Sequence, residues 1–329
     1  RPRGVTEAAR VGRVLHAGIH GRAPQNDHDD PGEGGAMTSL ADRINGRRVV
    51  ASVSGGKDSA AMSLWLTEQG IEHDRVFLDT GWEHDQTYEY LRGELTNKLG
   101  PITEIKAPLL MEDLIIKKGM FPSRVRRFCT QELKVKPIIA YLAQLMETGT
   151  DVINAVGIRA GESVSRSKML EWEWQDGFDC EVWRPLIAWS EAQVIAIHAR
   201  HGLPPNPLYL MGASRVGCWP CIYARKAEIR LIADKDPDRI VRLRVLEERV
   251  GVAARARAAA KGQTLVSDPA WFQAPLGTSG AAWPIGRVVE WSRTGKGGRQ
   301  MELFAPQHEE GCVRWGLCET GAEAEEVSK

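Results

Sequence analysis

The sequence has no net charge, few cysteines and no long hydrophobic run, and each shortage excludes a class of protein. Its 43 Lys and Arg residues balance 43 Asp and Glu residues, so no overall basic field marks it as a nucleic-acid-binding protein, and only a local patch could serve. No window approaches the roughly 18 uninterrupted apolar residues of a membrane span. Six cysteines in 329 residues are too sparse for a small disulfide scaffold. With 43% apolar and 26% charged residues, we expect a cytoplasmic globular enzyme.

Residues 1–36 differ in composition from the rest of the chain. They contain seven Gly and three Pro and show no sustained hydrophobic periodicity. They also lack the apolar segment of a secretory signal, whereas Met37 begins a sequence typical of a protein start. We therefore expect residues 1–36 to be a disordered, upstream or tag-like leader. An α/β domain is expected over residues 37–235, followed by a helical and irregular C-terminal extension over residues 236–329.

From Met37 onward, short β-branched runs alternate with segments of helical periodicity. The predicted strands are 48–53, 75–78, 102–106 and 152–158, and the predicted helices are 58–69, 85–99, 110–118, 131–146, 191–201 and 239–261. The stretch 262–310 shows no clear periodicity and is expected to form loops with short elements. Strands separated by helices predict a doubly wound parallel sheet of the α/β class. Ligands of such sheets bind at the carboxyl ends of the strands, so functional residues should concentrate there.

The strongest local signal is the segment SGGKDS at Ser54–Ser59, which follows a predicted strand and opens a predicted helix. Its two glycines allow a tight bend and a close approach of the backbone to an anion. The N–H groups at a helix start carry partial positive charge, and Lys57 adds a full one. It is not a Walker A loop, because the lysine follows the glycine pair directly. The alternative is a plain glycine turn before a capped helix, with the lysine in solvent.

Further motifs follow in order and extend this signal over about residues 45–250. They are FLDTG at 77–81 with Glu83, FCT at 128–130 with Leu133 and Lys134, GIRAGES at 157–163 with Arg166, RPLI at 184–187 with Trp189, NPLY at 206–209 and GCWPC at 217–221. Together with SGGKDS they resemble the PP-loop enzymes of the N-type ATP pyrophosphatase superfamily. The later motifs are similar to the branch that includes phosphoadenosine phosphosulfate (PAPS) reductase. A weaker C-terminal resemblance covers Cys312–Glu319.

The resemblance implies an adenine nucleotide α-hydrolase-type fold, ATP with Mg²⁺ or an adenylyl nucleotide as ligand, and sulfur chemistry. Sulfonucleotide reductases of this family have a degenerate loop and a nucleophilic cysteine in a Glu-Cys-Gly-x-His stretch. This chain keeps an intact loop, and no matching histidine follows Cys312 or Cys318. A pyrophosphate cradle has a purpose only if a β,γ-diphosphate binds there, which favours ATP cleavage between the α and β phosphates. The chain is therefore more similar to the DNA-phosphorothioation sulfurtransferase-like branch, which pairs an intact loop with a cysteine-held cluster.

Polar residues after the strands are the candidate nucleotide ligands. Asp79 can orient the adenosine or Mg²⁺, although a simple Asp-Thr-Gly turn is the alternative. Arg159, Arg166 and Arg215 can clamp a phosphate bidentately or form surface ion pairs, and Glu162 is expected to pair with them or to bind a metal. The predicted catalytic residues are Lys57, Asp58 and Arg159, and the predicted nucleotide-binding residues are Ser54, Gly55, Gly56, Lys57, Asp58, Ser59, Asp79, Thr80, Gly157, Arg159, Glu162, Arg166 and Arg215.

The cysteine spacing indicates a metal centre. Cys218 and Cys221 form a CxxC pair that can bind one metal but cannot complete its coordination. Cys129 follows a basic run that would stabilise a thiolate. The resemblance includes a C-terminal Trp-Gly-x-Cys-Glu pattern, which favours Cys318 as the fourth ligand, with Cys312 as the alternative. A 4Fe–4S cluster suits four cysteines, and zinc, a redox disulfide or free thiols are the alternatives.

These observations predict an ATP-dependent enzyme that adenylates a substrate, releases pyrophosphate and is linked to sulfur transfer. One alternative is a sulfonucleotide reductase that uses Cys312 or Cys318 as its nucleophile and releases sulfite. Another is a non-catalytic nucleotide-binding module with structural zinc. The expected partner is an adenine nucleotide, and a sulfur-donor protein, a DNA or tRNA acceptor and a second copy of the chain are further candidates. No membrane partner is expected.

Overall fold

The computed structural model describes residues 39–273 and 282–295 together with Trp315. The chain divides into two units, residues 1–43 and residues 44–329. The short helix α1 (Leu40–Ile44) begins in the first unit, where Ser39 Oγ accepts a hydrogen bond from the Asp42 N–H at 3.1 Å. All elements discussed below belong to the second unit. No helix in the described ranges is both long and apolar enough to cross a lipid bilayer.

The second unit is built on a six-stranded sheet with the strand order β3-β2-β1-β4-β6-β5. The strands are β1 (Arg48–Ser52), β2 (His73–Asp79), β3 (Ile102–Lys106), β4 (Val152–Val156), β5 (Trp172–Gln175) and β6 (Cys180–Trp183). Every neighbouring pair is parallel except β5 and β6, which pair antiparallel. Val49, Val50 and Ala51 of the central strand β1 are buried, as expected for a parallel sheet covered on both faces. The predicted α/β fold class is confirmed.

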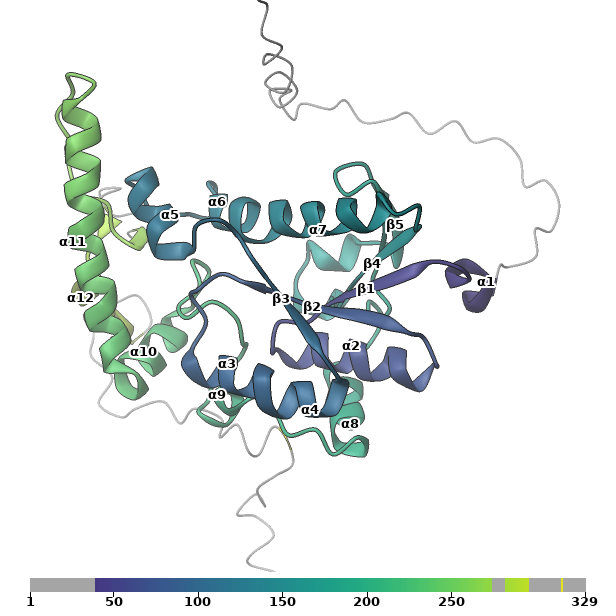
Figure 1. Ribbon diagram of the computed structural model, residues 1–329. Coiled ribbons are helices and arrows are strands. Elements are labelled where there is room, and N and C mark those ends of the chain that lie inside the picture. The colour runs from purple at the N-terminus through teal and green to yellow at the C-terminus, as the bar shows by residue number, and fades with distance from the viewer. Residues whose placement is uncertain (1–38, 274–281, 296–314, 316–329) are drawn as a thin grey trace, which may run out of the picture. The chain divides into compact units, whose positions relative to one another are not determined.

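Helices cover both faces of this sheet (Figure 1). One face carries α2 (Lys57–Glu68), α3 (Asp85–Tyr90), α4 (Thr96–Leu99), α8 (Glu191–Arg200) and α9 (Pro207–Leu210), and the other carries α7 (Lys136–Met146). Ile138 and Leu142 of α7 pack with Val50, Val76 and Val152 of the strands. Two π-helical segments, Leu91–Leu95 and Gln131–Val135, join α3 to α4 and the short helix α6 (Phe128–Thr130) to α7.

A further group of helices lies beyond the carboxyl end of β2. It consists of α5 (Met111–Lys118), α10 (Lys226–Lys235), α11 (Pro237–Ala259), α12 (Ile285–Ser292) and the hairpin of β7 (Phe272–Gln273) and β8 (Ala282–Trp283). Its core contains Trp82, which follows β2, together with Leu243, Leu246 and Trp271. The rings of Trp82 and Trp271 stack with their centroids 4.9 Å apart. The strand end that carries the predicted Asp79 site is therefore held by the C-terminal helices.

The structure differs from the predicted elements mainly after residue 168. The predicted strand 152–158 ends at Val156, because the chain turns at Gly157. Helix α10 was not predicted, since its ten residues give too short a periodic signal. The antiparallel strand β5 was also missed, because four residues alternate too briefly to be recognised. The predicted C-terminal extension around Cys312 and Cys318 lies outside the residues that the structure describes.

Candidate nucleotide-binding site and neighbouring cysteines

The phosphate loop, defined here as residues 54–59, forms a tight turn between β1 and α2. Gly55 has a φ of +73°, and a Cβ atom there would lie 3.0 Å from Thr87 Cγ2, so conformation and space both require glycine. Gly56 precedes α2 without a side-chain cap, which leaves the helix start open to an anion. Ser59 Oγ accepts a hydrogen bond from the first N–H of the loop at 3.1 Å and donates one to Gly56 O at 3.0 Å. The loop has the backbone form of an anion-binding turn.

Three side chains from the segment 198–209 hold the backbone of this loop. Tyr209 Oη accepts a hydrogen bond from the Lys57 N–H at 3.1 Å, and His198 Nε2 donates one to Lys57 O at 2.9 Å. Asn206 Nδ2 donates to Gly55 O at 3.2 Å. The sequence analysis missed His198, and its only signal for Asn206 and Tyr209 was the NPLY motif. These residues fix the shape of the loop from the side opposite β1.

The side chain of Lys57 is only 7% exposed. Its Nζ lies 3.3 Å from Glu191 Oε1 and 3.7 Å from Asp58 Oδ2. It also lies 5.1 Å from the centroid of the Tyr209 ring. A buried ammonium group costs free energy unless it is paired, and two carboxylates pair with it here. The alternative in which this lysine extends into solvent does not describe the structure.

The end of β4 lies directly against the start of α2. Arg159 Nε donates to Asp58 Oδ1, and the Arg159 N–H donates to Glu162 Oε2 at 2.8 Å. Glu162 also forms an ion pair with Arg166. A Cβ atom on Gly157 would lie 2.8 Å from Asp58 O, which is too close, so only glycine fits between the two elements. The structure therefore joins five predicted site residues to the phosphate loop through direct contacts.

Asp79 and Thr80, at the end of β2, are buried and fully hydrogen-bonded. Asp79 Oδ1 accepts from Tyr88 Oη at 2.7 Å, and Asp79 Oδ2 lies 3.2 Å from Lys106 Nζ. Thr80 Oγ1 donates to both carboxylate oxygens of Glu83 at 2.9 Å. Burial and the nearby carboxylates of Glu83 and Asp79 raise the pKa of Tyr88, so its phenol stays a hydrogen-bond donor. The Asp-Thr-Gly turn is therefore part of a polar network that begins at the sheet edge.

This network continues to the first cysteine of the CxxC pair. Cys218 Sγ lies 3.8 Å from Thr80 Oγ1 and 3.9 Å from Glu83 Oε1. Burial is the main cause that raises the pKa of Cys218 to about 12, and the positive charge of Lys134 acts against it. The pKa of Lys134 is raised in turn, chiefly by Cys218 and also by Glu83, Cys221 and Cys129. Three cysteines predicted as metal ligands thus surround one ammonium group.

Arg215 lies beside the second cysteine of the pair and away from the ion pairs of the phosphate loop. Its Nε is 2.9 Å from Glu228 Oε1. Its pKa is raised by Glu228 and Cys221 against the opposing effect of burial, and it hydrogen-bonds the Cys221 thiol. The next residue, Val216, approaches the loop, since a Cβ atom on Gly56 would lie 3.7 Å from Val216 O. The cysteine segment is therefore a neighbour of the phosphate loop.

The described residues do not by themselves complete a metal site. Cys129, Cys180, Cys218 and Cys221 are free thiols. Within residues 39–273 and 282–295, no three His, Cys, Asp or Glu side chains are arranged so that they could hold a metal ion. The predicted fourth ligand Cys318 and its alternative Cys312 lie outside the described residues. No catalytic step below is therefore derived through a cluster or zinc.

Residues 48–224 match the family model of the phosphoadenosine phosphosulfate reductase domain. The chain belongs to the PAPS reductase domain family. The match begins with β1 and includes the phosphate loop, the end of β2 and the CxxC pair. The predicted membership in the PAPS reductase-like PP-loop superfamily is confirmed, whereas the DNA-phosphorothioation branch stays a prediction.

Relatives of this PAPS reductase-family chain include proteins with and without a described activity. It is 33% identical over 326 residues to an uncharacterized 37.8 kDa protein of Escherichia phage 186, covering 82% of this chain and 96% of the phage protein. It is 34% identical over 157 residues to adenosine 5'-phosphosulfate reductase of Allochromatium vinosum, covering 46% of this chain and 59% of that enzyme. The crystal structure of PAPS reductase from Candida auris aligns with a TM-score of 0.42 at 19% identity, covering 54% of this chain and 84% of that one.

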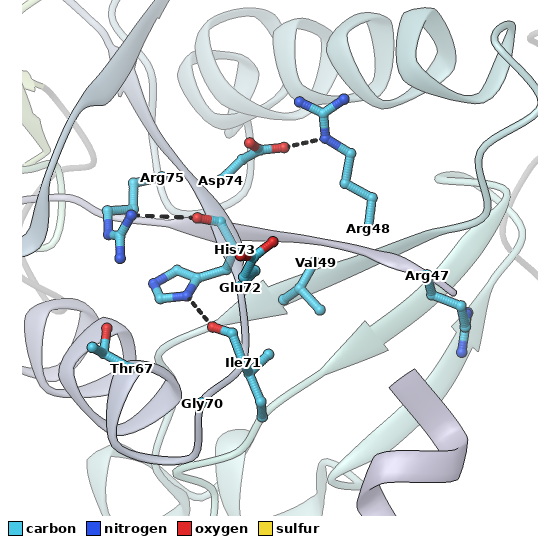
Figure 2. Close-up of a pocket in the computed structure, with 10 residues that line it drawn as sticks. All are labelled: Arg47, Arg48, Val49, Thr67, Gly70, Ile71, Glu72, His73, Asp74 and Arg75. Atoms are coloured by element: carbon cyan, nitrogen blue, oxygen red, sulfur yellow. Dashed lines mark hydrogen bonds and ion pairs between the residues drawn. The ribbon is translucent and has the colours of Figure 1, made fainter. Parts of the chain in front are cut away.

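A hollow of about 700 Å³ lies at the opposite edge of the sheet, at the amino ends of β1 and β2 (Figure 2). Arg47, Arg48 and Arg75 contribute to its lining. Arg48 pairs with Asp74, and Arg75 Nη1 donates to a backbone carbonyl at 3.4 Å. Arg47 pairs with two carboxylates. The guanidinium groups of this hollow are already engaged, which leaves the carboxyl edge of the sheet as the better site for a nucleotide in this PAPS reductase-family fold.

Proposed function

We propose that this PAPS reductase-family chain is an ATP pyrophosphatase that adenylates a substrate and so activates it for sulfur transfer. A substrate oxygen attacks the α-phosphorus, the bond to the α,β-bridging oxygen breaks, and pyrophosphate leaves. A sulfur nucleophile, such as a persulfide or sulfide, then attacks the activated carbon or phosphorus and displaces AMP. The observation that carries the proposal is the intact phosphate loop with its buried lysine, because a pyrophosphate cradle serves a ligand that has a β,γ-diphosphate.

The residues of the loop have distinct roles in this reaction. The backbone N–H groups at the start of α2 and the serine hydroxyls would bind the leaving pyrophosphate. Lys57 would exchange its present carboxylate partners for the phosphate and stabilise the charge that grows on the bridging oxygen. Removing one such contact typically costs on the order of 3 kcal/mol. Asp58 and Arg159, joined by an ion pair, would set the position of the α-phosphate. Mg²⁺ would enter with ATP and neutralise part of the triphosphate charge.

A sulfonucleotide reductase is the second candidate, and the 34% identity to the Allochromatium vinosum enzyme favours it. It would release sulfite from an adenylyl sulfate and would need no ATP. The deciding experiment incubates the purified chain with ATP and Mg²⁺, or with adenylyl sulfate and a dithiol reductant, and measures pyrophosphate and sulfite. Pyrophosphate supports the proposal, and sulfite supports the reductase. Tight nucleotide binding with neither product supports a non-catalytic binding module.

The Lys57→Ala variant tests the role of the loop. Pyrophosphate release should fall by roughly a hundredfold or more, because a contact of about 3 kcal/mol is lost in the transition state. The control is Lys136→Ala, which removes an exposed lysine that pairs with Glu132 on another helix. Full activity of Lys57→Ala would contradict the assignment.

We also propose that Cys129, Cys218 and Cys221 hold a 4Fe–4S cluster together with Cys318, with Cys312 as the alternative ligand and zinc as the alternative metal. The shared positive neighbour Lys134 supports this, because it favours thiolates at this position. Anaerobically purified protein should show visible absorbance and about four iron atoms per chain. Cys318→Ser should remove the iron if Cys318 is the ligand, and Cys312→Ser should remove it otherwise. Colourless protein that contains zinc would reject the cluster.

A further inference from the structure

Three arginines are exposed on the loop between α5 and α6, and we name residues 124–127 the arginine loop. Arg124, Arg126 and Arg127 are exposed, as is Val125 between them with 86% of its surface accessible. The loop has a defined turn, because Ser123 and Arg126 exchange two backbone hydrogen bonds of 3.1 and 3.2 Å. The sequence analysis assigned this basic run only to the stabilisation of a thiolate.

These guanidinium groups form no ion pair with a carboxylate among the described residues. Many other arginines of the chain do: Arg47, Arg48, Arg92, Arg184, Arg200, Arg242 and Arg255 each pair with Asp or Glu. The contrast matters because the chain carries equal numbers of acidic and basic residues. Three like charges within four residues repel one another, and an external anion would relieve that repulsion.

Two of the arginines are positioned by one aromatic ring. The guanidinium carbon of Arg124 lies 5.7 Å from the centroid of the Tyr223 ring, and that of Arg127 lies 5.3 Å from it. Such cation–π contacts orient a planar guanidinium group without using its N–H donors. The donors of both groups therefore stay directed outward, where they can bind phosphate oxygens bidentately.

The arginine loop borders the candidate active site. Arg127 precedes Cys129 by two residues, and Tyr223 follows Cys221 by two. Cys129 and Cys221 are close enough to influence each other, since the Cys221 charge raises the pKa of Cys129. A ligand bound to the arginine loop would therefore extend toward the cysteines and the phosphate loop.

We propose that the arginine loop and Tyr223 bind the phosphodiester backbone of a polynucleotide, which is the acceptor of the proposed reaction. An exposed surface with three guanidinium groups in a row suits an extended polyanion, because a small anion is usually enclosed in a concave site. The planar groups of Tyr223 and its two arginines also provide stacking surfaces for unpaired bases. The name of the acceptor rests on the proposed function, but binding itself does not.

Fluorescence anisotropy with short labelled single-stranded RNA, single-stranded DNA and duplex DNA tests the proposal on the full chain without ATP. The Arg124→Ala/Arg126→Ala/Arg127→Ala variant should bind at least about tenfold more weakly at low salt, and the slope of log K against log salt should fall by about 2 for single strands. The control variant Arg242→Ala/Arg249→Ala/Arg255→Ala removes the same charge from α11, where each arginine faces a carboxylate. It should retain wild-type binding.

The remaining arms separate this proposal from its competitors. Tyr223→Leu should weaken binding of single strands more than binding of the duplex, because only unpaired bases stack. Preference for RNA over DNA, or the reverse, identifies the polynucleotide and supports the proposal in either case. Equal losses in both triple variants, or binding of polyglutamate as tight as that of RNA and DNA, would overturn it. Pyrophosphate release in the absence of acceptor should be unchanged in the arginine-loop variant, so this proposal can fail while the proposed function stands.

Discussion

The indole ring of Trp315 packs edge-on against the imidazole ring of His198, with centroids 5.2 Å apart and planes at 76°. Trp315 also lies 5.7 Å from the ring of Tyr209 and is only 8% exposed. His198 and Tyr209 are the two side chains that hydrogen-bond the backbone of Lys57. A residue near the C-terminus therefore supports the phosphate loop through two intermediates.

Replacing Trp315 by alanine should weaken nucleotide binding without removing any nucleotide ligand. The loss of a buried aromatic ring leaves His198 and Tyr209 free to change rotamer, so the Lys57 backbone is held less firmly. We expect the Kd for ATP, measured by calorimetry, to rise about tenfold, and the free energy of unfolding to fall by about 3 kcal/mol.

Trp315→Phe is the control for this role, because it keeps an aromatic ring and most of the buried area. It should recover most of the affinity for ATP. If Trp315→Ala loses stability but binds ATP with unchanged affinity, the ring is a packing element only.

Gly157→Ala should disrupt the contact between β4 and α2. The new Cβ atom would lie 2.8 Å from Asp58 O and from Ser59 Cα, which are atoms that cannot move without distorting the loop. We expect a loss of about 1–3 kcal/mol in urea unfolding and a large loss of ATP binding. Gly161→Ala is the matched control, because nothing lies within 4 Å of the Cβ position there. Equal behaviour of the two variants would show that the close approach has no functional role.

The sequence predicted the part of the fold in which local and periodic signals agree. The strand at 48–53, the glycine turn and the following helix each have a strong local signal, and β1 and α2 lie within one residue of the predicted bounds. The predicted contact of Arg159 and Gly157 with the loop follows from topology, because adjacent parallel strands β1 and β4 end at the same edge.

The residues that sequence reasoning missed act through contacts between distant segments. His198 lies on α8 and has no ligand-like neighbour in sequence, yet it reaches Lys57 O across 141 positions. Arg215 was predicted to clamp a phosphate, and its pairing with Glu228 depends on the fold of the unpredicted helix α10. The arginine loop was visible as a basic run, but its unpaired state could not be known before the carboxylates were placed.

The stability of the protein should fall as the pH is lowered through the normal range of histidine. Burial lowers the pKa of His198 below its ordinary value of 6.5, so the folded state binds fewer protons than the unfolded state at mildly acidic pH. Stability is therefore complete above about pH 6.5 and declines below it. Thermal unfolding between pH 7 and pH 5 should show this decline, and His198→Gln should show less of it. His73 and His84, whose pKa values are also lowered by burial, should account for the remainder.

The ion pair between Asp58 and Arg159 should be energetically coupled in the absence of nucleotide. Their side chains are 15% and 8% exposed, so water screens the interaction only weakly. A double-mutant cycle of Asp58→Asn and Arg159→Gln should give a coupling free energy of about 1–3 kcal/mol in urea unfolding. The same cycle on the more exposed pair of Arg92 and Glu104 should give less than about 1 kcal/mol.

A bound triphosphate should change the first of these couplings and leave the second unchanged. If Arg159 contacts the α-phosphate, repeating the unfolding with a non-hydrolysable ATP analogue should make Arg159→Gln more destabilising relative to the wild type than it is without ligand, because the variant also loses ligand affinity. An analogue that stabilises wild type and Arg159→Gln equally would show that Arg159 only supports Asp58, and would remove it from the set of nucleotide ligands.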